Sequence, residues 1–329
     1  MQTDFLNLKP ARPRGLWRDV PPAIFPPMLG LLGLGLGWRR GASSFGLDIG
    51  VSDLVLGAVI LLFAFGVLAY GVKLARRPGV VLDDLHVLPG RAGLAALTDS
   101  VMLSAAVLLA YAPGLGEWVL WIGLALHATL ALLLTWVMAR GPAERRRVTP
   151  IWHLSYVGFI LAPLAAVPLG YVALSGLILQ ATMAAAVLIW GVSAVQFARA
   201  SVPAPLRPLL AVHLAPACLF AIVAASIGLN GLALGFGVLA LAMFFALLSA
   251  GRWIAAAGFS PFWGAFTFPI AAFANMGFAL DAAGFGAGWR FIGMLALVAA
   301  TVAVPVIAVK VLKLWAKGQL AGRTNAAVA

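Results

Sequence analysis

The chain alternates between long apolar segments and short polar segments that carry most of its charges. The apolar segments are continuous rather than alternating residue by residue, so they predict helices and not barrel strands. About 20 apolar residues are enough to cross the hydrocarbon core of a bilayer. The pattern predicts ten spans, at approximately 22–38, 51–74, 94–113, 117–139, 148–169, 171–197, 209–228, 232–250, 258–281 and 289–314.

The composition agrees with an all-α integral membrane protein. Hydrophobic residues make up 63% of the chain and charged residues 10%, with a mean hydropathy of +1.05. A soluble domain carries about 25% charged residues. The net charge of +12 could indicate a nucleic-acid partner, but the basic residues lie between apolar segments, so they indicate topology instead. We therefore expect a lipid bilayer and no nucleic acid as partner.

The distribution of basic residues supports both the span count and the orientation. With both termini in the cytoplasm, 19 of the 22 basic residues fall on the inner side, and only Arg39, Arg40 and Arg290 fall outside. We expect a multi-pass protein of the cell inner (plasma) membrane. We expect residues 1–20 to form a cytoplasmic arm, 21–315 a ten-helix transmembrane domain, and 316–329 a cytoplasmic tail without a structural signal.

The ninth predicted span has two unlike faces when it is projected as a helix at 100° per residue. One face is bulky, and the other is small and slightly polar with a single ring. A helix facing a narrow path would look like this, and so would a Phe packed in a helix bundle. The bulky face holds Phe262, Phe266 and Phe273, and the small face holds Gly264, Phe268, Ala271 and Asn275.

The other odd-numbered spans, apart from the third, repeat a stripe of small residues together with a proline. Kinked helices with small faces would suit an inner ring that lines a path, with the even-numbered helices outside. Close helix packing produces the same stripes, so both interpretations stay open. The candidate pore-lining residues are Gly30, Gly158, Ala162, Ala217, Ala221, Gly264, Ala271 and Asn275, and the candidate helix kinks are Pro26, Pro163, Pro216 and Pro269.

Four local sequences resemble the tellurite-resistance/dicarboxylate transporter family, which contains bacterial TehA, fungal malate and sulfite permeases and the slow anion channels of plant guard cells. The most specific is a W-x-x-[FY]-[ST]-F-P signature at Trp263, Phe266, Thr267, Phe268 and Pro269. The resemblance covers about residues 20–315. Its four segments are PAIFPPMLGLLGLGLG (22–37), VTPIWHLSYVGFILAP (148–163), LRPLLAVHLAP (206–216) and FSPFWGAFTFP (259–269).

The resemblance implies ten helices in a quasi-fivefold array of five hairpins, with the odd helices around a central pore and a TehA-like homotrimer. It also implies that the Phe before the signature proline, Phe268, is the gate. The helical projection independently places Phe268 alone on the small face. Gly264, at a commonly aromatic position, and the third span, without a mid-span proline, depart from the pattern and leave the pore diameter open.

No catalytic, metal or cofactor site is expected. The four histidines and the lone Cys218 have no metal-ligand spacing, so we predict no enzyme. His127 is expected to be a hydrogen-bonding residue inside the bundle, His213 is a weaker pore candidate, and His153 is expected at the membrane interface. The acidic residues Asp53, Asp99, Glu117 and Asp281 fall at span ends, where we expect helix capping or hydration at the membrane interface.

The favoured function is an anion channel that passes small inorganic or organic anions through a central pore gated by Phe268. The alternative is a coupled secondary exporter of sulfite, tellurite or four-carbon dicarboxylates that uses Asp99, His127 or His213. A membrane-embedded enzyme or scaffold is the third hypothesis, and no acid–base pair or metal set in the sequence supports it.

Overall fold

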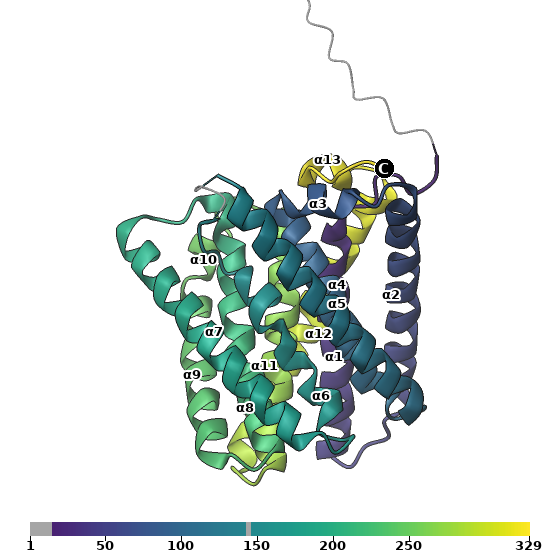
Figure 1. Cartoon of the computed structure of the whole chain (residues 1–329). Coiled ribbons are helices and arrows are strands. Elements are labelled where there is room, and N and C mark those ends of the chain that lie inside the picture. Colours follow the sequence, from purple (N-terminus) through teal and green to yellow (C-terminus); the bar gives the residue numbers. More distant parts are fainter. Residues whose placement is uncertain (1–14, 143–145) are drawn as a thin grey trace, which may run out of the picture.

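The computed structural model describes residues 15–142 and 146–329, and these residues form helices and no β-strand. Residues 1–14, most of the predicted N-terminal arm, lie outside the described part of the chain. The long helices run between two ends of the molecule, and α3, α13 and the C-terminus share one of them (Figure 1). We call this end the terminal face and the other end the far face.

Eight of the described helices are long and apolar enough to cross a membrane, by length and composition alone. The two remaining predicted spans correspond to α1, which is rich in glycine and proline, and to an interrupted segment, His153–Ala166, that is too short to cross as one regular helix. The all-α membrane fold is therefore confirmed, while the count of ten crossings stays a prediction.

The inner helical segments contact one another in a closed ring, and each pairs with the outer helix that follows it in the chain. Four of the five inner segments enter through a 3₁₀ or π turn, and α4 is the regular one. The inner segments are η1 Pro22–Ile24 with α1 Phe25–Ser44, then α4 Leu88–Leu108, then η3 His153–Val157 with η4 Gly158–Leu161 and α6 Pro163–Ala166, then η5 Ala204–His213 with α8 Leu214–Ser226, and η6 Pro261–Trp263 with α11 Gly264–Ala282.

The outer helices present apolar side chains outward, as helices that face lipid do. Between 72% and 78% of the residues in the apolar stretches of α4, η5–α8 and α11 are buried, against 17–39% for the outer helices. Large exposed residues on the outside include Leu61, Leu132 and Val302. The outer helices are α2 Gly50–Arg76, α5 Pro113–Arg140, α7 Val172–Arg199, α9 Asn230–Ser249 and α12 Ala287–Ala316, and the short ones are α3 Val80–Leu85, α10 Gly251–Ile254 and α13 Leu320–Thr324.

A buried ion pair fastens both ends of the chain to the terminal face. Lys73 Nζ lies 2.8 Å from Asp84 Oδ2 with both side chains fully buried, and it also donates to the carbonyl of Val20 at 2.9 Å. The backbone N–H of Ala327 donates to Asp84 Oδ1 at 2.8 Å. The tail, which carries no structural signal in the sequence, thus contains the short helix α13 and is held by this contact.

The contact between α1 and α11 depends on glycines. A Cβ on Gly30 would overlap the side chain of Thr267, and a Cβ on Gly33 would lie 3.1 Å from the Phe268 ring. Small residues let two membrane helices approach until backbone groups are in reach. Accordingly, Thr267 Oγ1 donates to the carbonyl of Pro26 at 3.1 Å and Asn275 Nδ2 donates to that of Gly33 at 2.8 Å.

Replacing Gly30 with Ala should lower stability, because the new methyl group overlaps Thr267 and its backbone and the helices have to separate. Overpacking of this kind costs about 1–3 kcal/mol. The unfolding temperature in detergent measures the effect. Gly57→Ala is the matched control, since Gly57 lies on the exposed side of α2 and a Cβ added there would have no other atom within 4 Å. An equal unfolding temperature for the two variants would contradict the proposed packing.

Candidate pore and gate

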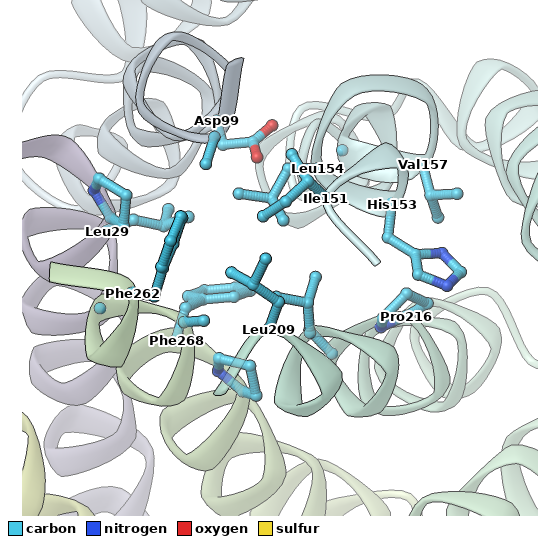
Figure 2. A pocket seen from close by; sticks show the side chains of 18 of the residues that line it. Leu29, Asp99, Ile151, His153, Leu154, Val157, Leu209, Pro216, Phe262 and Phe268 are labelled. Carbon is cyan, nitrogen blue, oxygen red and sulfur yellow. The ribbon is translucent and has the colours of Figure 1, made fainter. Parts of the chain in front are cut away.

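Two cavities lie inside the ring of inner segments. The first, here the termini-side cavity, is lined by residues of all five inner segments, including Leu29, Asp99, His153, Pro216 and Phe262 (Figure 2). Its lining is almost entirely apolar, and it offers about 70 Å³ to the centres of water molecules. Since about 10–15 Å³ admits one water, several waters or a small anion fit.

The second, here the arginine-side cavity, is lined by the later halves of the inner helices, toward the far face. It includes Arg39, Arg40 and Asn275 and offers about 180 Å³ to the centres of water molecules. Arg39 is neutralised by Asp53, at 2.8 Å, and also donates to the hydroxyl of Tyr111. No hydrogen bond or ion pair is found for Arg40 among the described residues, so it is the uncompensated positive charge at this cavity.

Phe268 and Leu219 are the residues that border both cavities. Phe268 comes from α11 and Leu219 from α8, which are neighbours in the ring. The Phe268 ring is half-buried and rests on the glycine face of α1 at Gly33. A path from one cavity to the other therefore has to pass these two side chains.

Thr267 and Pro269 fix the direction of the Phe268 side chain from either side. The Thr267 hydroxyl shares its single hydrogen between the carbonyl of Gly264 in α11, at 2.7 Å, and that of Pro26 in α1, at 3.1 Å. Pro269 lies inside α11 and has no N–H, so the carbonyl of Ala265, which borders the termini-side cavity, loses its usual intrahelical donor. The backbone on both sides of Phe268 is therefore fixed, while the Phe268 ring itself borders the two cavities.

The candidate pore-lining residues divide into two groups. Gly158 and Gly264 line the termini-side cavity, and Asn275 lines the arginine-side cavity. The other candidates border neither cavity, and their pore-lining role stays a prediction: Gly30 packs against Thr267, and Ala162, Ala217, Ala221 and Ala271 are fully buried in the helix bundle.

Of the four candidate kink prolines, only Pro269 lies inside an α-helix. Pro26, Pro163 and Pro216 occupy the first turn of α1, α6 and α8, directly after a 3₁₀ turn. A proline is tolerated in the first turn because its missing N–H has no intrahelical partner there. The irregular backbone therefore precedes these three prolines, and the inner α-helices begin inside the ring.

The helical projection places Phe262 on the bulky face, opposite Phe268, whereas both side chains border the same cavity in the structure. The Phe262 side chain lines the termini-side cavity beside Phe268 (Figure 2). Pro261–Trp263 is a 3₁₀ turn, so the 100° projection does not apply before Gly264. Phe266 packs edge-on against Trp263, and Phe273 is buried and stacks on Phe244 at a ring-centroid distance of 4.4 Å.

Asp99 does not cap a span end. Helix α4 begins at Leu88, six residues before the predicted start at about 94, because Pro89 occupies its first turn and Arg91 bonds to the carbonyl of Leu85. Asp99 therefore lies in the middle of α4, is 2% exposed, and borders the termini-side cavity. His127 of α5 lies beside it, with Nδ1 3.4 Å from Oδ1.

His153 is also buried inside the protein, and its expected depth at the membrane interface stays a prediction. Its Nε2 lies 2.9 Å from Nδ1 of His213, so the π turn η3 and the end of η5 are joined by an imidazole pair. His153 borders the termini-side cavity, whereas His213 does not. Among the residues described, no group of three or more His, Cys, Asp or Glu is close enough to hold a metal ion.

Sequence reasoning missed Arg40 and Leu219. The charge distribution identifies Arg40 only as a basic residue on the outer side of the membrane. Arg40 follows the predicted glycine-rich first span by two residues, and its side chain borders the arginine-side cavity. Leu219 has no distinguishing sequence signal, since leucine is common in every span. Its position at the constriction follows from the packing of α8 against α11.

A ring of irregular membrane helices around two cavities, separated by one aromatic and one aliphatic side chain, is the architecture of a channel or transporter. The family model described as SLAC1, voltage-dependent anion channel, matches residues 19–312. The chain therefore belongs to the SLAC1 family of anion channels and transporters, as the four local sequences indicated. A search of curated proteins finds no matching relative.

Cysteines placed in the two cavities should react with a charged, membrane-impermeant thiol reagent from opposite sides. Ala265→Cys should be modified only from the terminal face and Leu36→Cys only from the far face, because Phe268 and Leu219 lie between them. The native Cys218 is buried and should not compete.

Labelling of sealed vesicles and of inside-out vesicles measures this sidedness and also tests the cytoplasmic placement of the termini. Ala274→Cys, fully buried and outside both cavities, is the unreactive control. Modification of both test positions from the same side would contradict a barrier between the cavities.

Proposed function

We propose that this protein conducts small anions along the axis of the helix ring, and that the side chain of Phe268 closes the path. The observation that carries the proposal is the position of Phe268 between the two cavities. An aromatic ring in a narrow apolar constriction blocks hydrated ions by its size and by excluding water. Membership of an anion channel family supports the same conclusion.

The charges along this path favour an anion over a cation at the far side. Arg40 adds an unpaired positive charge to the arginine-side cavity, which raises the local concentration of anions. Helices α1, α8 and α11 begin at the termini-side cavity, so the positive ends of their dipoles are directed there. These contributions are weak and act at several places, which suits passage rather than tight binding.

Removing the Phe268 ring should open the path. We expect Phe268→Ala to raise chloride or nitrate conductance by roughly tenfold or more, because a single ring supplies most of the steric and dewetting barrier. Planar-bilayer recording of the purified protein measures the conductance, and an anion series ranks selectivity.

Phe266→Ala is the matched control, since Phe266 lies two residues away on the same helix, packs against Trp263 and borders neither cavity. Its conductance should stay at the wild-type level. Unchanged conductance in Phe268→Ala, or an equal increase in both variants, would overturn the gate assignment.

A coupled exporter of sulfite, tellurite or four-carbon dicarboxylates is the second candidate. Asp99 in the wall of the termini-side cavity favours it, because a channel for anions has no evident need of a buried carboxylate. Coupled transport should saturate with substrate, and an imposed pH gradient should drive uptake against a substrate gradient in vesicles. Flux that is linear in substrate and indifferent to the gradient would leave only the channel.

The remaining assignments rest on the family resemblance and the charge distribution. We propose a homotrimer in the inner (plasma) membrane, with the 1–20 arm and the 316–329 tail in the cytoplasm and the channel domain at 21–315. The exposed apolar surface of the outer helices supports contact with lipid or with further copies of the chain. The mass of the detergent-solubilised assembly distinguishes a trimer from a monomer.

A further inference from the structure

The carboxylate of Asp99 conflicts with the passage of anions. It lies in the middle of α4, is 2% exposed, and borders the cavity that an anion entering from the terminal face would occupy. Figure 2 shows it at the edge of this cavity, away from Phe268. In an apolar, poorly hydrated cavity the repulsion between two negative charges is little screened. An ionised Asp99 would therefore oppose the occupancy that the proposed function requires.

A histidine lies beside this carboxylate on the neighbouring helix. His127 Nδ1 is 3.4 Å from Asp99 Oδ1 and 2.7 Å from the hydroxyl of Thr98. The Thr98 hydroxyl also lies 2.9 Å from the carbonyl of Ala95. The tautomer of the neutral imidazole determines whether Thr98 or His127 donates the hydrogen between them.

One side-chain atom of each residue lacks a hydrogen bond among the described residues. Asp99 Oδ1 and His127 Nε2 are buried and have no hydrogen bond with any described residue. The residue next to both is Gly158, which borders the cavity: a Cβ there would lie 2.9 Å from Nε2 and would overlap Oδ1. The Phe159 ring stands edge-on to the imidazole at 4.4 Å and holds it in place.

Other charged groups on the elements packed against α4 lie farther along the helices and are mostly neutralised. The Lys73–Asp84 pair is at the terminal face and the Arg39–Asp53 pair at the far face. Arg40 belongs to the cavity beyond Phe268. His153 borders the same cavity as Asp99, and its imidazole is bonded to His213. Among the described residues, His127 is thus the titratable group directly in contact with Asp99.

We propose that Asp99 and His127 form a proton-binding site, and that one proton and one anion occupy the termini-side cavity together. Without the proton the pair carries one negative charge. With it, as neutral carboxylic acid beside neutral imidazole or as carboxylate beside imidazolium, the pair has no net charge. An anion in the termini-side cavity then lies beside a pair without net charge and is not repelled by it. This inference rests on the proposed anion pathway and adds the proton as a second ligand of that pathway.

Linkage makes the relation reciprocal: if the proton favours the anion, the anion favours the proton to the same extent. Adding chloride or nitrate to weakly buffered protein in detergent should therefore cause proton uptake, approaching one proton per chain. These anions do not themselves take up protons near neutral pH. A pH-indicator dye measures the uptake, which should be lost in Asp99→Asn, whose side chain has the same shape and no titration.

The same site should set the pH dependence of anion flux. In vesicles that carry Phe268→Ala, so that the ring does not limit flux, we expect flux to rise roughly tenfold between pH 8 and pH 6, because protonation removes a charge from the pathway. Adding Asp99→Asn should give high flux at both pH values. Adding His127→Gln should keep the dependence and move its midpoint to lower pH, because the carboxyl loses the imidazole that shares its proton.

Asp83→Asn is the control, since Asp83 forms an exposed ion pair with Arg77 and borders neither cavity. It should keep the pH dependence. The inference is overturned if Asp99→Asn retains the pH dependence and the proton uptake, or if only His153→Gln abolishes them. Absence of anion flux in Phe268→Ala would instead count against the proposed function.

Discussion

The contact between α1 and α11 is the constraint on which the pathway depends. Glycines at positions 30 and 33 let the two backbones approach until Thr267 and Asn275 bond to carbonyls of α1. These bonds set the height and rotation of α11, and Phe268 lies between them. A side chain on either glycine would push α11 away and move the ring from the axis. The position of the Phe268 ring thus depends on two residues that have no side chain.

Four of the five inner segments begin with 3₁₀ or π turns, and this irregular backbone also shapes the interior of the ring. The 3₁₀ and π turns border the termini-side cavity, and α1, α6, α8 and α11 follow them in the chain. Backbone groups freed in this way are tolerated within a membrane because they border a cavity and not lipid. The outer helices, regular and apolar, cover the inner segments from the bilayer.

The electrostatics of the two halves differ. The arginine-side cavity has an unpaired cation, and the termini-side cavity has a carboxylate beside a histidine. In the proposed pathway, an anion would be attracted on one side of Phe268 and would face a proton-dependent charge on the other. The proposed gate at Phe268 and the proposed protonation of Asp99 would be separate controls, because they act on different groups in the ring.

The sequence alone was enough to predict the membrane class, the approximate helices and the placement of Phe268 on a small-residue face, since hydrophobicity and the 100° periodicity are local properties. It also carried the signature that indicated the family.

The sequence alone did not reveal the meeting of Asp99 with His127, which are 28 residues apart on different helices, nor the shared position of Leu219 and Phe268. It misplaced Phe262, because a 3₁₀ turn has another periodicity, and Asp99, because α4 begins earlier than its hydropathy indicates. Which side chains share a cavity is decided by the closure of the ring, and that depends on contacts between segments remote in the chain.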